Sequence, residues 1–264
     1  ISQTMAFIES DKIKPLRVVV DASNAVGSLE IDNLEKHLPQ IEFIKLNWEL
    51  DGRYPGHQPN PFLKENRRQL VSKIKEVGAD FGAAFDGDAD RIFFMDENGD
   101  YIFGVYVNGL IAEKMCQKES GRVVLHDVRA TRYIRKKIIE SGGVPKIELV
   151  GHAFFKNRMK KENALFGGEC SGHIYYNFGD YMVENSLIAF GQILQIISES
   201  GESLGKLAGD GRKNFPVSGE YNFILPGFGI ADDLTPEAMI VMNNILNKVR
   251  EKYSNGEISD FDTL

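Results

Sequence analysis

The sequence predicts an α/β protein with two consecutive three-layer αβα domains, whose sheets are mixed and mostly parallel, and a truncated C-terminal α+β piece. Two observations lead to this fold class. Apolar or β-branched runs alternate with amphipathic helical runs, and polar residues gather where the apolar runs end. The length of 264 residues suits about two domains. We expect the domains at 1–103 and 104–216, followed by the incomplete start of another domain at 217–264.

The first domain opens with a strand–helix–strand unit. Residues 17–21 and 41–46 are apolar or β-branched runs with a helical pattern at 31–38 between them, which is the spacing of a parallel βαβ pair. A loop at 51–61 follows, with three prolines and two glycines in eleven residues. After it we expect a helix that ends at Gly78, strands at 81–85 and 92–95, and a hairpin turn at Asn98-Gly99.

The second domain has the same alternation of strands and helices. Polar residues follow three of its expected strands, at the edge where open α/β sheets bind ligands. They are His126, Asp127 and Arg129, then Gly151 and His152, then Gly-Gly-Glu-Cys-Ser-Gly-His at 167–173. We expect helices near 107–116, 131–140, 154–162 and 182–197, and strands at 122–125, 147–150 and 164–166.

The C-terminal piece contains a good helix start, Thr235-Pro236-Glu237, with an N-cap, a proline at the first helical position and an acid in the first turn. We expect a helix from there to about Tyr253, a strand at 223–225 and the opening of another at 258–264. So little sheet is not expected to form a complete domain. The chain also begins at Ile1 rather than Met, so we expect it to be a piece of a longer protein.

Composition argues against several classes of protein. A net charge of −7 and a pI of about 5.4 argue against nucleic acid as the main partner. No run approaches the roughly 18 apolar residues of a membrane span, and no signal peptide is visible. The two cysteines, Cys116 and Cys170, provide no disulfide framework and suit a reducing compartment. We therefore expect a cytoplasmic location and neither a membrane nor a nucleic-acid partner.

Three aspartates spaced two apart, Asp86, Asp88 and Asp90, lie in the loop between the strands expected at 81–85 and 92–95. Side chains at i, i+2 and i+4 of an extended loop point the same way, so these carboxylates converge. Converged anions repel one another unless a cation lies among them. An all-oxygen site favours Mg²⁺ or Ca²⁺ over zinc, so a site for a hard cation is the leading interpretation.

Three other interpretations of this loop fit the sequence less well. An EF-hand needs glycine at the sixth position, where Arg91 stands, and helices rather than strands on both sides. A phosphatase with Asp86 as its nucleophile would want a hydroxyl where Asp90 stands. A solvated acidic turn is the plainest alternative, but small residues separate the three carboxylates, as a loop folded round an ion requires.

The glycine-rich stretch at 167–173 is the second dense constellation. Glu169, Ser171 and His173 alternate, so an extended segment offers an acceptor, a hydroxyl and an imidazole on one face. This set suits hydrogen bonding to the hydroxyls of a sugar. A Ser-His nucleophile is disfavoured because no nucleophile elbow is present. Cys170 points the opposite way and is expected to be packed rather than reactive, and a structural role is the alternative for His173.

At this point the sequence resembles a known family, the α-D-phosphohexomutases, which include phosphomannomutases and phosphoglucomutases. FDGDADR at 85–91 is similar to the family's Mg²⁺ loop, and GGECSGH at 167–173 to its sugar-recognition loop. VVVDASNAVG from Val18, HQPNP at 57–61 and Val-Gly-His at 150–152 are also similar to family segments. The matching motifs follow one another in the family's order along nearly the whole chain.

The resemblance implies a four-domain, Mg²⁺-dependent enzyme that interconverts hexose 1-phosphate and hexose 6-phosphate of mannose, glucose or both. A phosphoserine on the first domain donates phosphate, a bisphosphate intermediate reorients, and hexose 1,6-bisphosphate acts as activator. By the same resemblance Asp86, Asp88 and Asp90 bind Mg²⁺, and Glu169, Ser171 and His173 bind the sugar. Arg91, Arg129 and His152 are the catalytic candidates, Arg129 standing where the family usually has lysine. Because arginine stays protonated, an anion contact suits Arg129 better than acid–base catalysis.

Two family motifs are not found in the chain: the Thr-Ala-Ser-His-Asn-Pro-like serine loop of the first domain and the Arg-x-Ser-Asn-Thr-Glu-Pro-like phosphate loop of the fourth. The chain is therefore expected to hold domains two and three and the start of domain four, with domains one and four of the parent as its missing partners. By itself it is expected to lack turnover. The alternative function is a non-catalytic module that binds sugar phosphates.

Overall fold

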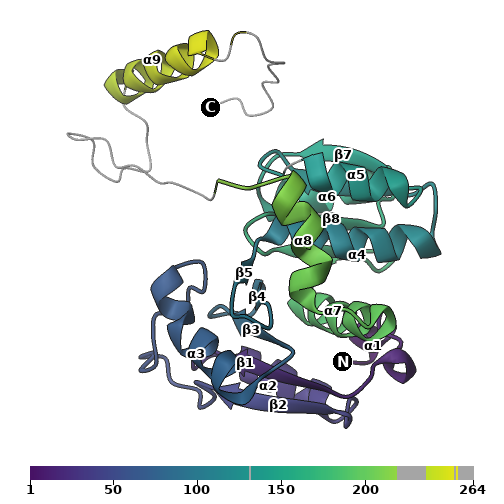
Figure 1. Cartoon of the computed structure of the whole chain (residues 1–264). Coiled ribbons are helices and arrows are strands. Elements are labelled where there is room, and N and C mark those ends of the chain that lie inside the picture. The colour runs from purple at the N-terminus through teal and green to yellow at the C-terminus, as the bar shows by residue number, and fades with distance from the viewer. Residues whose placement is uncertain (131, 219–235, 253, 255–264) are drawn as a thin grey trace. The chain divides into compact units, whose positions relative to one another are not determined.

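The structure is a computed structural model that describes residues 1–130, 132–218, 236–252 and 254 (Figure 1). The chain divides into two units, Ile1–Val217 and Ser218–Leu264. In the second unit, α9 (Pro236–Lys252) begins at the expected proline, while the strands expected at 223–225 and 258–264 lie outside the described residues. None of the described helices is both long and apolar enough to cross a membrane.

The first sheet has five strands in the order β2-β1-β3-β4-β5. β1 runs parallel to β2 and β3, whereas β4 and β5 follow as antiparallel hairpins, so the sheet is mixed. The strands expected at 41–46, 81–85 and 92–95 are confirmed residue for residue. The elements of this part are β1 (Leu16–Asp21), α2 (Gly27–Glu35), β2 (Ile41–Leu46), α3 (Arg68–Val77), β3 (Phe81–Phe85), β4 (Ile92–Met95) and β5 (Tyr101–Ile102), after the short α1 (Ser2–Met5) and η1 (Ser10–Lys12) and with η2 (Lys64–Arg67) before α3.

The second sheet repeats the design in the order β10-β9-β8-β6-β7. β6 runs parallel to β7 and β8, and β9 and β10 are antiparallel. The expected α/β class, with two mixed sheets in sequence, is therefore confirmed. Its elements are α4 (Gly104–Lys118), β6 (Val123–Asp127), α5 (Arg132–Glu140), β7 (Val144–Glu148), α6 (His152–Glu162), β8 (Phe166–Gly168), β9 (Ile174–Asn177), β10 (Met182–Glu184), α7 (Ser186–Ser200) and α8 (Leu204–Asn214).

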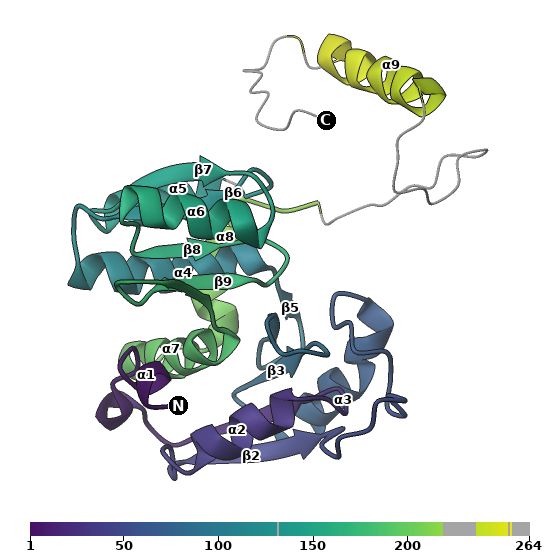
Figure 2. The same ribbon diagram turned by 180° about the vertical axis from the view of Figure 1, so that it is seen from behind.

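Helix α7 joins the two sheets. Its buried Phe190 packs against Phe43, Phe81 and Phe85 of the first sheet, with ring centroids 6.1, 5.9 and 6.4 Å apart. The same helix contacts α4 of the second domain and the N-terminal α1, and both views show it between the two layers of strands (Figures 1 and 2). One hydrophobic core therefore runs from the first sheet into the second.

The structure corrects several expected element boundaries. Residues 182–184, expected as the first turn of a helix, form β10, which pairs with β9, and Asn185 then caps α7 through its side-chain oxygen. The strand expected at 147–150 begins earlier, at Val144, and tolerates Pro145 because β7 is an edge strand. The strand expected at 164–166 lies at Phe166–Gly168 and the helix expected at 31–38 ends at Glu35, whereas β9 and α8 were not expected at all.

Candidate active site

The aspartate loop, residues 86–90, follows β3 and gathers its three carboxylates. Oxygens of Asp86, Asp88 and Asp90 lie within 4.8 Å of one another, with Asp86 buried and Asp88 exposed. Ala89 adopts a left-handed φ of 57°, and its carbonyl accepts a hydrogen bond of 2.5 Å from the Ser186 hydroxyl at the start of α7. The loop is thus bent and held by the next domain, and its all-oxygen donor set fits a hard divalent cation.

The electrostatics of the loop also fit a cation. Arg91 neutralises one carboxylate, since its Nε donates to Asp86 Oδ2 at 2.6 Å and its backbone N–H donates to Oδ1 at 3.2 Å. Burial, together with the negative charges of Asp86 and Asp88, raises the pKa of Asp90 to about 6, although nearby His173 opposes the shift. Burial and the neighbouring negative charges therefore both disfavour the ionised form of Asp90, and a divalent cation among the three carboxylates would favour it.

In the sugar loop, residues 167–173, whose first two residues end β8, Glu169 is held by three donors. Its Oε1 accepts hydrogen bonds from the Tyr175 hydroxyl at 2.6 Å and from the Gly151 N–H at 3.1 Å. Its Oε2 accepts one from Ser171 Oγ at 3.0 Å. Glu169 is 1% exposed, so these donors fix a buried carboxylate beside a hydroxyl. The expected pairing of Glu169 and Ser171 on one face is what the structure shows.

Arg129 reaches the sugar loop from the end of β6. Its Nη2 and Nε donate to Asp127 Oδ2 at 2.7 and 3.1 Å, and Nη2 lies 3.7 Å from Glu169 Oε2. The same Asp127 oxygen accepts the backbone N–H of Cys170 at 2.8 Å. Burial raises the pKa of the Cys170 thiol well above its usual range, which agrees with the expected packed rather than reactive cysteine.

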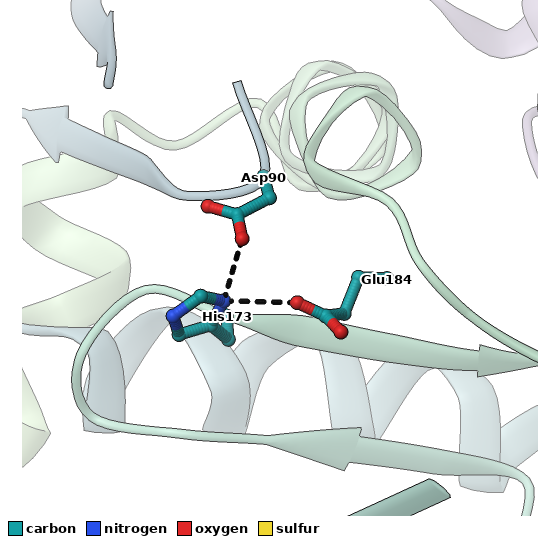
Figure 3. Close-up of side chains that lie close together, drawn as sticks. All are labelled: Asp90, His173 and Glu184. Atoms are coloured by element: carbon teal, nitrogen blue, oxygen red, sulfur yellow. Dashed lines mark hydrogen bonds and ion pairs between the residues drawn. The ribbon is translucent and has the colours of Figure 1, made fainter. Parts of the chain in front are cut away.

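His173 does not join Glu169 and Ser171 but turns toward the aspartate loop (Figure 3). Its Nδ1 lies 3.1 Å from Glu184 Oε2 and 3.4 Å from Asp90 Oδ2. Burial opposes protonation of His173, but the hydrogen bond to Glu184 and the negative charges of Asp90, Glu169 and Glu184 together raise the pKa of the imidazole. Burial likewise opposes ionisation of Glu184, yet His173 and Lys156 (2.5 Å) lower the pKa of this carboxyl to about 2. His152 is exposed at the start of α6, with Nδ1 3.7 Å from Glu184 Oε1.

The two loops meet through their backbones. Arg91 and His173 form an isolated antiparallel bridge, and the N–H of Ile92 donates to the carbonyl of Gly172 at 3.4 Å. Gly172 has a φ of 101°, a backbone conformation that would be strained in a residue with a side chain. The aspartate loop of the first sheet and the sugar loop of the second therefore line one site. Eight of the nine candidate residues lie in these two loops or contact them, whereas the exposed His152 contacts Glu184 of β10.

Three further residues of the site were not among the candidates. Asp127 holds Arg129, Tyr175 holds Glu169, and Glu184 joins His173, Lys156 and His152. Tyr175 continues the alternation of 169, 171 and 173, a signal that could have identified it. Glu184 fell in a segment assigned to a helix, so its position facing His173 was not visible in the sequence.

Comparisons with known proteins identify the same domains. The model for the phosphoglucomutase/phosphomannomutase alpha/beta/alpha domain II matches residues 1–99, and the domain III model matches residues 98–215. A protein named "Phosphohexose mutases" from Xanthomonas campestris pv. campestris (strain B100) is 41% identical over 219 residues, which are 83% of this chain and 48% of the relative. The chain thus spans about half the length of the relatives that it matches.

Solved structures agree with this match. A phosphoglucomutase/phosphomannomutase family protein from Burkholderia thailandensis superposes with a TM-score of 0.72 at 30% identity, over 79% of this chain and 45% of that one. An Aspergillus fumigatus N-acetylphosphoglucosamine mutase, solved with GlcNAc-6P and magnesium, shares the fold at 15% identity, with a TM-score of 0.59 over 78% of this chain and 52% of that one. The chain belongs to the phosphoglucomutase/phosphomannomutase family, the α-D-phosphohexomutases, and contains its domains II and III.

Proposed function

We propose that this chain supplies the metal-binding and sugar-binding half of a phosphohexomutase that interconverts hexose 1-phosphate and hexose 6-phosphate of mannose, glucose or both. The meeting of the two loops carries the proposal: Arg91 bridges His173, and Asp90 lies 3.4 Å from the same imidazole. We place domain II at 1–103, domain III at 104–216 and the start of domain IV at 217–264. A metal loop facing a sugar loop suits phosphoryl transfer to a sugar hydroxyl.

In this proposal Asp86, Asp88 and Asp90 hold one Mg²⁺, which neutralises charge on the phosphoryl group in transfer. Arg91 fixes the orientation of Asp86 through the 2.6 Å contact and so presets one metal ligand. In the parent enzyme a phosphoserine from outside these residues is the phosphate donor, and hexose 1,6-bisphosphate is the activator.

In the sugar loop, Oε2 of the buried Glu169 accepts only the Ser171 hydroxyl among the described hydrogen bonds, so a hexose hydroxyl would bind here by exchanging with that contact. Because Tyr175 and Gly151 occupy Oε1, the other oxygen and the Ser171 hydroxyl are placed to bind vicinal hydroxyls of the hexose. Arg129 stays charged and contacts a phosphate oxygen of the substrate rather than moving a proton. His173 and His152 both lie beside Glu184, with their Nδ1 atoms 3.1 and 3.7 Å from its carboxylate oxygens.

Binding measurements on the 264-residue chain test the site. Calorimetry with mannose 6-phosphate and glucose 6-phosphate is expected to show binding that Mg²⁺ strengthens, and that falls about tenfold in Ser171→Ala. Asp88→Asn, at an exposed ligand, is expected to abolish the effect of Mg²⁺, whereas the exposed Asp180→Asn is the matched control. Sugar-phosphate binding that neither Ser171→Ala nor Asp88→Asn alters would contradict the assignment of the site.

A coupled mutase assay with a hexose 1,6-bisphosphate activator tests the other half of the proposal. We expect no turnover from the 264-residue chain, because the donor serine loop is not among its residues. Turnover above background would contradict that expectation. Release of inorganic phosphate that disappears in Asp86→Asn would instead favour a phosphatase with Asp86 as its nucleophile.

A further inference from the structure

A second groove lies away from the two loops and is lined by residues of η2, α3, the edge strand β5 and the chain that follows α8. Its volume is about 800 Å³, within the usual range for small-molecule sites. Gly99 of the β4–β5 turn lies beside Val71 of α3, and both residues line the groove. None of its lining residues belongs to the aspartate loop or the sugar loop.

Four cations that line this groove, Lys64, Arg67, Arg68 and Lys75, have no carboxylate within ion-pair distance among the described residues. Among the described residues, the side chains of Lys64, Arg68 and Lys75 form neither an ion pair nor a hydrogen bond, and Arg67 has no carboxylate partner. Lys73 of the same helix, outside the groove, pairs with Glu76 at 2.8 Å. Four such cations in a chain of net charge −7 produce a local positive field that favours an anion.

Arg67 is the most informative of the four. It is only 9% exposed, and its Nη1 donates to the backbone carbonyls of Pro61 and Phe62 at 2.8 and 3.3 Å. These carbonyls and the Tyr101 ring satisfy the guanidinium but do not neutralise its charge, so an anion in the groove beside Arg67 would be stabilised. The groove therefore contains a fixed, buried cation in addition to its exposed lysines.

The other lining residues indicate which kind of anion the groove would bind. Tyr101 and Phe103 are half-buried, with ring centroids 4.8 Å apart, and the Arg67 guanidinium lies 4.2 Å from the Tyr101 ring centre. Asp100 is the single carboxylate in the lining, so the groove has few strong acceptors for the hydroxyl donors of a free sugar. Aromatic and apolar surface beside cations suits a flat heterocycle joined to several phosphate charges.

We propose that this groove binds a nucleotide with at least two phosphates. The phosphates contact Lys64, Arg68 and Lys75 with the charge of Arg67 beside them, and the base lies against Tyr101 and Phe103. This site is distinct from the hexose-phosphate site, and its existence does not depend on the proposed mutase function.

Calorimetry at low ionic strength on the 264-residue chain tests this site, with ADP, UDP and pyrophosphate as the probes. We expect ADP or UDP to bind about tenfold more tightly than pyrophosphate, and the double variant Arg68→Ala/Lys75→Ala to weaken nucleotide binding about tenfold or more. Phe103→Leu is expected to weaken nucleotide binding but not pyrophosphate binding. Lys73→Ala, on the same helix but ion-paired outside the groove, is the control and is expected to bind as the unaltered chain does.

Three results would overturn the proposal. They are no binding of either nucleotide, equal affinity for pyrophosphate and nucleotide, or nucleotide affinity that Arg68→Ala/Lys75→Ala leaves unchanged. The affected side chains of the double variant are exposed, and circular dichroism of each variant checks that it is folded. Since added salt screens exposed charges, nucleotide binding is also expected to weaken as ionic strength rises.

Discussion

Replacing Tyr175 by phenylalanine isolates the hydrogen bond that holds Glu169. The Tyr175 side chain is fully buried on β9, and its hydroxyl donates to Glu169 Oε1 at 2.6 Å. Phe155 stacks on the same ring, with centroids 4.9 Å apart and an angle of 17° between the planes. Because phenylalanine keeps the ring and its stacking, Tyr175→Phe removes only the hydroxyl.

The neighbouring tyrosine provides a matched control for the size of the effect. Tyr176 is equally buried, and its hydroxyl donates to the neutral Gln192 Oε1 at 2.8 Å. A hydrogen bond to a charged group contributes about 1.5–3 kcal/mol and a neutral one about 1 kcal/mol. We therefore expect Tyr175→Phe to lower the free energy of unfolding by about 2 kcal/mol and Tyr176→Phe by about 1 kcal/mol. The difference corresponds to about fivefold in the unfolding constant.

Urea unfolding near neutral pH, followed by far-UV circular dichroism, measures both variants. Because both tyrosines lie on one strand, any domain-by-domain unfolding affects the two in the same way. Hexose-phosphate binding provides the second measurement, since Tyr175→Phe frees Glu169 to move and is expected to weaken binding, whereas Tyr176→Phe leaves it unchanged. A cost for Tyr175→Phe no larger than that for Tyr176→Phe would refute a charge-assisted bond to Glu169.

Three further predictions concern the parts of the fold that support the site. The hydrogen bond between His57 and Asp21 raises the pKa of His57 above its ordinary 6.5. The unaltered chain is therefore expected to be more stable than His57→Gln below pH 6.5, and this difference is lost as the pH rises through the folded-state pKa. A difference in the free energy of unfolding that does not change with pH would contradict the prediction. Phe190→Ala removes the ring that packs α7 against the first sheet, so it is expected to lower the free energy of unfolding by about 3–5 kcal/mol, measured in urea. A loss below about 1 kcal/mol would show that the shared core contributes little to stability. Gly104→Ala places a Cβ 2.8 Å from a backbone oxygen of the sugar loop and is expected to lower the free energy of unfolding by about 1–3 kcal/mol. Gly209→Ala in α8 meets open space, so it is expected to be neutral or slightly stabilising. Thermal melts of both variants compare them.

Local structure followed from local sequence where apolar runs had clear ends. Three strands of the first sheet begin and end where turn residues bound their apolar runs. Helix α9 begins at its proline for an equally local reason. Boundaries were wrong where two elements adjoin without a turn signal: Met182–Glu184 forms a strand only because β9 pairs with it. Periodicity reports the conformation that a segment favours but not the partner that it meets.

The candidate site also has one part that local sequence determines and another that depends on the tertiary structure. By itself, the sequence determined the convergence of Asp86, Asp88 and Asp90 and the chemistry of the sugar loop, because spacing along one short segment decides which side chains share a face. Only the tertiary structure decided that His173 leaves Glu169 and Ser171 to join Asp90 and Glu184 (Figure 3). That contact depends on α7 packing both sheets into one core, a sum of many distant contacts that no local pattern encodes.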